Sequence, residues 1–242
     1  MTTAKGLVTV WSLLHDGAMP AKKLIAACVL FAVVGGPFGS ASRADPFSPP
    51  SEGFRSGWSG GGDHRRLKVV EGQSPVSSEG PRRRFIIEIQ KSMGRSGERF
   101  ADEVEKILYD PRSWGGQGRL GMKRVDSGAA AFRVTLAKPA MVDRLCAPLP
   151  TNGRYSCFNG YRSVINTRRW RNAAASYNYR EHVIAYRRYL INHEVGHALG
   201  HGHRACPARG AEAPVMMQQT KGVRPCNRNW WPLGYERGPR PS

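Results

Sequence analysis

The hydrophobic pattern between residues 67 and 166 alternates between strand-like runs and helix-like repeats. Short apolar runs, continuous or alternating with polar positions, are typical of strands. Such runs occupy residues 67–70, 85–89, 122–125, 132–136 and 163–166. Phe100, Val104 and Ile107 recur at helical spacing and predict a helix over 97–109. A shorter helix is expected over 139–145.

The longest helix is expected to end at Leu199. Residues 178–181 resemble a capping box, in which the asparagine side chain would accept a hydrogen bond from the first turn. Ile184 and Ile191 lie on one apolar face of this helix, and Gly200 supplies the left-handed position that stops it. Strands interleaved with helices, followed by a long helix, predict an α+β domain over residues 83–242.

The N-terminal segment has the pattern of an export signal. Lys22 and Lys23 precede 13 apolar or small residues at 24–36, which is short for a membrane span of about 20. We therefore expect a signal peptide over residues 1–44, with Met19 as an alternative start. The mature protein would be secreted or held at the cell envelope; an uncleaved segment would instead anchor it in the membrane.

Composition narrows the class of protein further. The 242 residues include 37 Lys and Arg against 18 Asp and Glu, a formal charge of +19. Such a charge favours anionic surroundings, and in an exported chain without a nucleic-acid-binding motif it suggests anionic cell-envelope polymers rather than nucleic acid. Gly and Pro are frequent over residues 45–82, and this composition predicts a linker. We expect a monomer.

Four cysteines remain once the signal segment is removed, which suggests two disulfides formed in an oxidising compartment. They are Cys146, Cys157, Cys206 and Cys226, and three connectivities are possible. We favour Cys146–Cys157 because the residues between them are turn-forming, and this leaves Cys206–Cys226.

A cluster of histidines carries the candidate chemistry, in the pattern HExxHxxGxxH. His193 and His197 are four residues apart, so they face the same way from a helix. Gly200 allows a sharp turn that returns His203 toward them. Three imidazoles leave one position of a tetrahedral zinc open, as a catalytic site requires. Glu194 would then be the general base acting on water.

The cluster predicts one Zn²⁺ per chain. His201 is the alternative third ligand, although it follows Gly200 too closely for the chain to turn back easily toward the other two histidines. His64 and His182 are assigned no role. A structural zinc site would need a fourth protein ligand and no adjacent base.

Residues 193–203 match the extended zinc motif of the metzincins, with a methionine following at 216. The chain from about Arg82 to Pro232 also resembles an uncharacterised family of exported zincin-like proteins from high-GC Gram-positive bacteria. The segments that carry this resemblance are 143–146, 151–153, 192–203, 214–220 and 231–232. It implies a metzincin-like fold: a twisted mixed sheet, a long active-site helix and an irregular C-terminal subdomain.

The resemblance also implies a role for the methionines. Met216 would be the Met-turn residue that forms an apolar floor beneath the histidines, with Met217 as the alternative. Some metzincins have a tyrosine two residues after this methionine, where this sequence has Gln218. A mechanism that relies on that tyrosine is therefore not expected.

Together these features predict an exported zinc metallopeptidase acting on peptides or proteins. The residues themselves imply zinc-assisted hydrolysis, and the peptide substrate comes from the resemblance. Two alternatives remain: a basic cell-envelope binding module with a structural zinc, and a zinc amidase acting on peptidoglycan peptides.

Overall fold

The computed structural model describes residues 63–238, so the predicted signal peptide over 1–44 lies outside the described residues. The elements, in chain order, are η2 (His64–Arg66), β1 (Leu67–Val69), β2 (Arg82–Gln90), η3 (Lys91–Met93), α1 (Ser96–Leu108), η4 (Gly116–Gly118), β3 (Gly121–Arg124), β4 (Phe132–Ala137), α2 (Pro139–Cys146), β5 (Cys157–Phe158), β6 (Arg162–Asn166), α3 (Thr167–Asn172), η5 (Ala175–Tyr177), η6 (Tyr179–His182) and α4 (Val183–Ala198).

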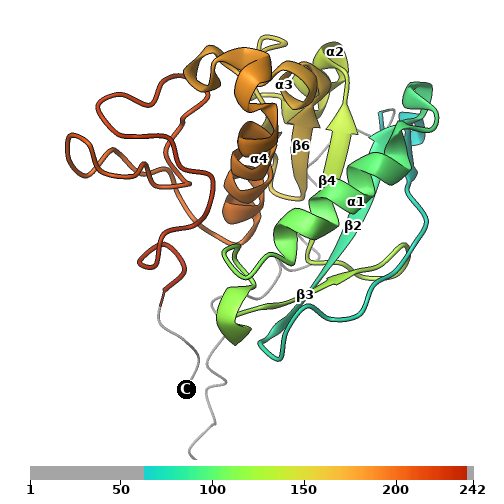
Figure 1. Ribbon diagram of the computed structural model, residues 1–242. Helices are drawn as coiled ribbons and strands as arrows, with labels where there is room; N and C mark the ends of the chain where they lie inside the picture. The colour runs from blue at the N-terminus through green and yellow to red at the C-terminus, as the bar shows by residue number, and fades with distance from the viewer. Residues whose placement is uncertain (1–62, 239–242) are drawn as a thin grey trace, which may run out of the picture. The chain divides into compact units, whose positions relative to one another are not determined.

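The α+β class is confirmed, with a mixed six-stranded open sheet at its centre (Figure 1). The strand order is β1-β2-β4-β6-β5, and β3 pairs with the first half of β2. Strands β2, β3, β4 and β6 are parallel, whereas β1 and β5 are antiparallel to their neighbours. The central strands are covered on both faces, which is why residues 85–89 are all buried and residues 85–87 form a continuous apolar run rather than an alternating one.

The two faces of the sheet bury separate hydrophobic clusters. Ile165 belongs to the larger cluster, beneath α1 and α4, while its neighbour Val164 belongs to a smaller cluster with α2. Adjacent residues of a strand point to opposite faces, so α2 lies on the side of the sheet away from α4. The long helix α4 is thus fixed against the central strands, and its C-terminal end is held in place.

The folded domain begins earlier than residue 83. Strand β1, at the position expected from the sequence, pairs with β2, and Leu67, Val70 and Ser74 are buried. The Arg124 guanidinium donates to the carbonyl of Val70 at 3.1 Å. The last part of the linker predicted over residues 45–82 is therefore packed on the sheet.

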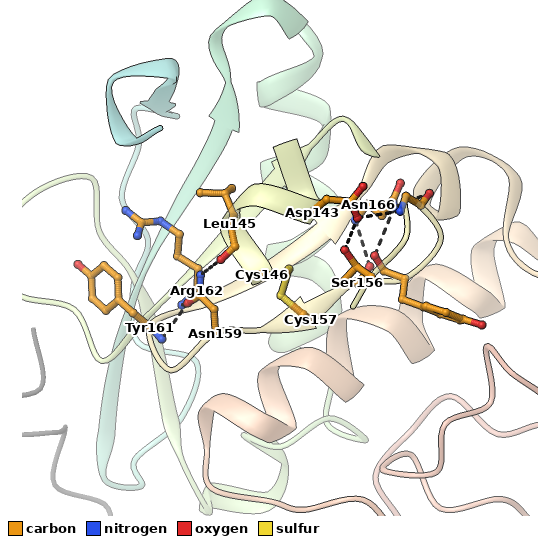
Figure 2. Close-up of a disulfide and its surroundings, with 12 residues drawn as sticks. Asp143, Leu145, Cys146, Ser156, Cys157, Asn159, Tyr161, Arg162 and Asn166 are labelled. Atoms are coloured by element: carbon orange, nitrogen blue, oxygen red, sulfur yellow. Dashed lines mark hydrogen bonds between the residues drawn. A yellow bond between two sulfur atoms is a disulfide. The ribbon is translucent and has the colours of Figure 1, made fainter. Parts of the chain in front are cut away.

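Both disulfides have the favoured pairing, Cys146–Cys157 and Cys206–Cys226. Figure 2 shows the first, which joins the end of α2 to β5. The second closes a loop in residues 199–238, a segment without helices or strands that is irregular as expected. Two disulfides are typical of extracellular proteins. Within residues 63–238, no helix is both long and apolar enough to cross a bilayer.

Helix α4 begins later than the capping pattern predicts. Asn178 has a left-handed backbone, with φ of 50°, and its side chain does not cap the helix. Its side-chain oxygen accepts from Arg228 at 2.8 Å instead, and its amide donates to Glu181. Residues 179–182 consequently form a 3₁₀ turn, and Ile184, predicted to lie on the apolar face, is exposed.

A buried carboxylate on β2 links three strands on the α2 side of the sheet. Glu88 accepts from Arg162 and Thr135 at 2.8 and 2.9 Å and also pairs with Arg133. Burial raises the pKa of Glu88, but the hydrogen bond and charge of Arg162, together with Arg133, outweigh it and hold the pKa below its ordinary value.

Glu88→Gln would keep the side-chain shape but leave Arg162 buried without its counter-ion. We expect the free energy of unfolding near neutral pH to fall by about 3 kcal/mol, as measured by urea denaturation. Because the pKa of Glu88 is lowered in the folded state, this stabilisation is complete above the ordinary carboxyl pKa. It is lost as the pH falls through the lowered value. Exposed Glu79→Gln is the control, and equal stability of both variants would contradict the interpretation.

Candidate metal centre

The last two turns of α4 carry the first three residues of the histidine motif. His193 and Glu194 are buried and His197 is partly exposed. The helix stops where predicted, because Gly200 adopts a φ of +92° that other residues rarely adopt. The amide of His201 donates back to the carbonyl of Gly196 at 2.9 Å, which reverses the chain.

The structure brings His193, His197 and His203 together, with one ring nitrogen of each within 4.8 Å of the others. The Nε2 atoms of His197 and His203 are 3.1 Å apart. Two nitrogens bound at 2.0–2.1 Å to one tetrahedral zinc would be about 3.3 Å apart, so the observed separation fits a shared metal ion. Among residues 63–238, these three histidines form a group that could hold a metal ion.

Hydrogen bonds to backbone carbonyls determine how two of the rings are oriented. Nδ1 of His193 lies 2.8 Å from the carbonyl oxygen of Val215, and Nδ1 of His197 lies 2.8 Å from that of His201. A carbonyl only accepts, so each Nδ1 must carry the proton and donate it. Each Nε2 therefore has a free lone pair, which is the form that ligates a metal.

The surroundings favour the neutral imidazoles that a metal requires. Burial, helped by the neighbouring His197, lowers the pKa of His193 to about 3. Burial is also the largest cause of the lowered pKa of His197 and of His203. The neutral form of all three rings is thus favoured near neutral pH.

Glu194 is held beside these rings by the sheet. Its backbone carbonyl accepts from the Ser163 hydroxyl of β6 at 2.8 Å. Burial raises the pKa of its carboxyl to about 8. In the described part of the chain no cationic side chain forms an ion pair with it, so no charged side chain offsets the effect of burial.

His201, the alternative third ligand, is placed elsewhere. Its ring stacks on Trp114 with centroids 4.3 Å apart. Trp114 is itself fixed, because its indole N–H donates to the carbonyl of Asn192 at 2.8 Å. His182 lies at the other end of α4 beside Glu181.

Met216 is fully buried against the helix between the two ligands. A Cβ at Gly196 would approach the Met216 sulfur closer than van der Waals contact allows, and Trp114 at 2.7 Å. Met217 is only half-buried, and its carbonyl accepts from the Tyr189 hydroxyl at 3.0 Å. Of the two methionines, Met216 is therefore the one packed beneath the site.

Glu236 is a residue that the motif analysis missed. It is 2% exposed, and its carboxylate accepts from the amides of Val215, Met216 and Leu233, each at 2.9 Å. Since the carbonyl of Val215 binds the His193 ring, Glu236 supports the loop that orients a ligand. A lone acidic residue near the C-terminal end of an irregular segment gives no periodic or spacing signal.

The histidines open onto a cleft of about 520 Å³. One rim contains residues 149–151 and 155–158, and the other contains residues 200–203 with 218, 220 and 221. The first rim is tied to α2 by the Cys146–Cys157 disulfide (Figure 2). The Asp143 carboxylate also accepts from the amide of Gly153 at 2.7 Å, and the Ser156 hydroxyl accepts from the amide of Asn166 at 3.0 Å. This rim is therefore rigid at both ends.

Residues 57–230 match the model of a family described as "Protein of unknown function (DUF3152)". The chain belongs to this family. No curated protein matches the chain. No solved structure matches it either. The part shared with the DUF3152 family includes the three histidines, Glu194 and Met216, whereas Glu236 lies beyond it.

Gly196→Ala tests the close contact between α4 and Met216. Alanine normally stabilises a helix interior by about 1 kcal/mol over glycine. Here we expect the opposite, a loss of about 1–3 kcal/mol in the free energy of unfolding, because the methyl group overlaps the sulfur. The loss should be smaller when the substitution is made in a Met216→Ala background, as a double-mutant cycle would measure. A stabilised single variant would show that the contact is loose.

Glu236→Gln tests the support of the loop. The amide offers a single acceptor oxygen and places donors against backbone N–H groups. We expect zinc affinity, measured by competition with a chelator, to fall by about 10–100-fold, as for other groups that orient metal ligands. Exposed Glu212→Gln is the control in the same segment. Unchanged zinc affinity in Glu236→Gln would mean that the loop is held without this carboxylate.

Proposed function

We propose that this protein is a zinc-dependent metallopeptidase with a metzincin-like domain. The observation that carries the proposal is the convergence of three imidazole nitrogens in an open cleft, with Glu194 adjacent. The signal pattern and the disulfides support export, to the cell exterior or envelope.

In this proposal His193, His197 and His203 hold the metal ion, and the Val215 and His201 carbonyls keep two of their rings in the ligating tautomer. A bound zinc ion would supply a Lewis acid that polarises a substrate carbonyl and acidifies water. Glu194 accepts a proton from the attacking water at a carboxylate oxygen and delivers it to the leaving amine.

A catalytic role is favoured over a structural one by the donor count. A structural zinc closes its coordination with a fourth protein ligand. Among the described residues the cluster has three members, and the His201 ring, the alternative ligand expected from the sequence, stacks on Trp114. Because the three histidines line the cleft, a substrate there could reach a metal ion that they hold.

A peptide is the substrate that the shape of the cleft favours. Strand β5 ends the sheet and also lines the cleft, and among residues 63–238 no strand pairs with its outer edge. An extended peptide can add to such an edge through main-chain hydrogen bonds. The open mixed sheet, the long helix and the irregular segment after it are consistent with a metzincin-like fold.

The decisive test compares Glu194→Gln with His197→Ala. Purified protein should bind about one zinc per chain. Glu194→Gln should retain the metal and thermal stability but lose about 10²–10⁴ in hydrolysis, because it removes only the base. His197→Ala should lose metal, stability and activity together. His182→Ala, a histidine outside the cluster, should behave like wild type.

Metal analysis, thermal unfolding and two hydrolysis assays give the result. One assay uses casein, and the other uses purified cell walls to detect an amidase acting on peptidoglycan peptides. Full activity of Glu194→Gln, or no hydrolysis of either substrate by the zinc-loaded protein, would favour a binding module with a structural zinc. Loss of zinc in both variants would mean that Glu194 is a ligand.

A further inference from the structure

Lys221 is the charged residue that lines the cleft outside the candidate metal site. Apart from the histidines and Glu194, Lys221 is the single charged side chain among the described residues that line it. Lys221 is exposed to solvent. Within residues 63–238 no carboxylate lies within ion-pair distance of its ammonium group. The Lys221 ammonium is therefore free to bind the carboxylate of a ligand.

The ammonium group of Lys221 is held between the two rims. It donates to the Gln218 side-chain oxygen at 3.2 Å, on its own rim. It also lies 5.5 Å from the centroid of the Tyr155 ring, on the opposite rim, within the range of a cation–π contact. Both partners are neutral, so they orient the cation without neutralising it.

Lys221 and the three histidines of the metal site line the same cleft. The cation therefore lies in the cleft where a scissile bond would be placed. Leu149 and Phe158 add apolar surface to the opposite rim.

We propose that Lys221 forms a subsite that binds a carboxylate of the substrate, an inference that rests on the proposed peptidase function. This subsite would select peptides with an acidic residue close to the scissile bond. An Asp or Glu side chain would lie against the apolar rim with its carboxylate on the Lys221 ammonium. A peptide C-terminal carboxylate has the same chemistry and is the alternative source. A charge-assisted hydrogen bond to a partly exposed cation predicts a preference of roughly tenfold.

The experiment uses zinc-loaded protein and peptides blocked at both ends. The peptides differ only in carrying Glu, Gln or Lys at one position, which is moved along the sequence on either side of the cleaved bond. Wild type should cleave the Glu peptide about tenfold better than the Gln peptide, measured as kcat/KM, at one or two positions. Versions with a free C-terminus distinguish a terminal carboxylate from a side chain.

Two variants assign the preference to Lys221. In Lys221→Met the Glu-to-Gln ratio should fall to about one, and in Lys221→Glu the Lys peptide should become preferred, while zinc content stays at the wild-type level. Lys68→Met is the matched control, because Lys68 is exposed on β1 at the opposite edge of the sheet from β5. High salt should reduce the wild-type preference, since it screens exposed charges.

A binding measurement separates this proposal from the peptidase function. Zinc-loaded Glu194→Gln should bind the Glu peptide about tenfold more tightly than the Gln peptide, and adding Lys221→Met should abolish the difference. If wild type cleaves nothing but this binding preference is found, the peptidase proposal fails and the carboxylate subsite stands. Equal cleavage and equal binding of the two peptides, or a preference retained in Lys221→Met, would overturn the subsite.

Discussion

The burial of the second half of α4 is the constraint on which the rest of the structure depends. Three separate parts of the protein hold this half of the helix: the Ser163 hydroxyl of β6 bonds the Glu194 carbonyl, the Trp114 indole bonds the Asn192 carbonyl, and Tyr189 bonds the loop at Met217. A helix fixed on three sides cannot rotate without breaking buried hydrogen bonds. The directions of His193 and His197 follow from that position.

The segment after α4 is irregular, yet several of its backbone carbonyls accept hydrogen bonds from buried side chains. Buried side chains replace the hydrogen bonds that a strand or helix would make: Gln219 donates to the carbonyls of Pro214 and Asn229, and the Asn229 side chain donates to those of Ala213 and Trp231. Backbone groups buried without such partners would be costly. This is how a segment without regular structure can hold Met216 and Val215 beneath the helix.

The sequence predicted the elements with a repeating pattern and missed those fixed by single contacts. The strands at 85–89 and 132–136 and the helix α1 were found because apolar spacing indicates burial directly. The two-residue strand β5 and the short helix α3 were not found, since neither is long enough to show a period.

Pattern analysis also fails where a helix is buried on most sides. Tyr186, Tyr189, Asn192 and His193 are all buried together with the apolar positions of α4, so polar residues do not mark an exposed face. This is why the exposure of Ile184 was not foreseen. The zinc motif, by contrast, depends on local spacing within one helix and one turn, and the three histidines that it selects are the three that converge.

The site is ordered by contacts that do not require a metal ion. The two ring-to-carbonyl hydrogen bonds, the left-handed Gly200 and the Glu236 carboxylate each fix part of the ligand geometry through the protein alone. In small zinc domains the metal instead organises an unfolded chain, and most of its binding free energy is spent on folding. Here the sheet and the two disulfides already position the helix and the loop, so a metal ion would meet ligands held close to their bound arrangement. The free energy of binding is then available for affinity rather than for ordering the ligands.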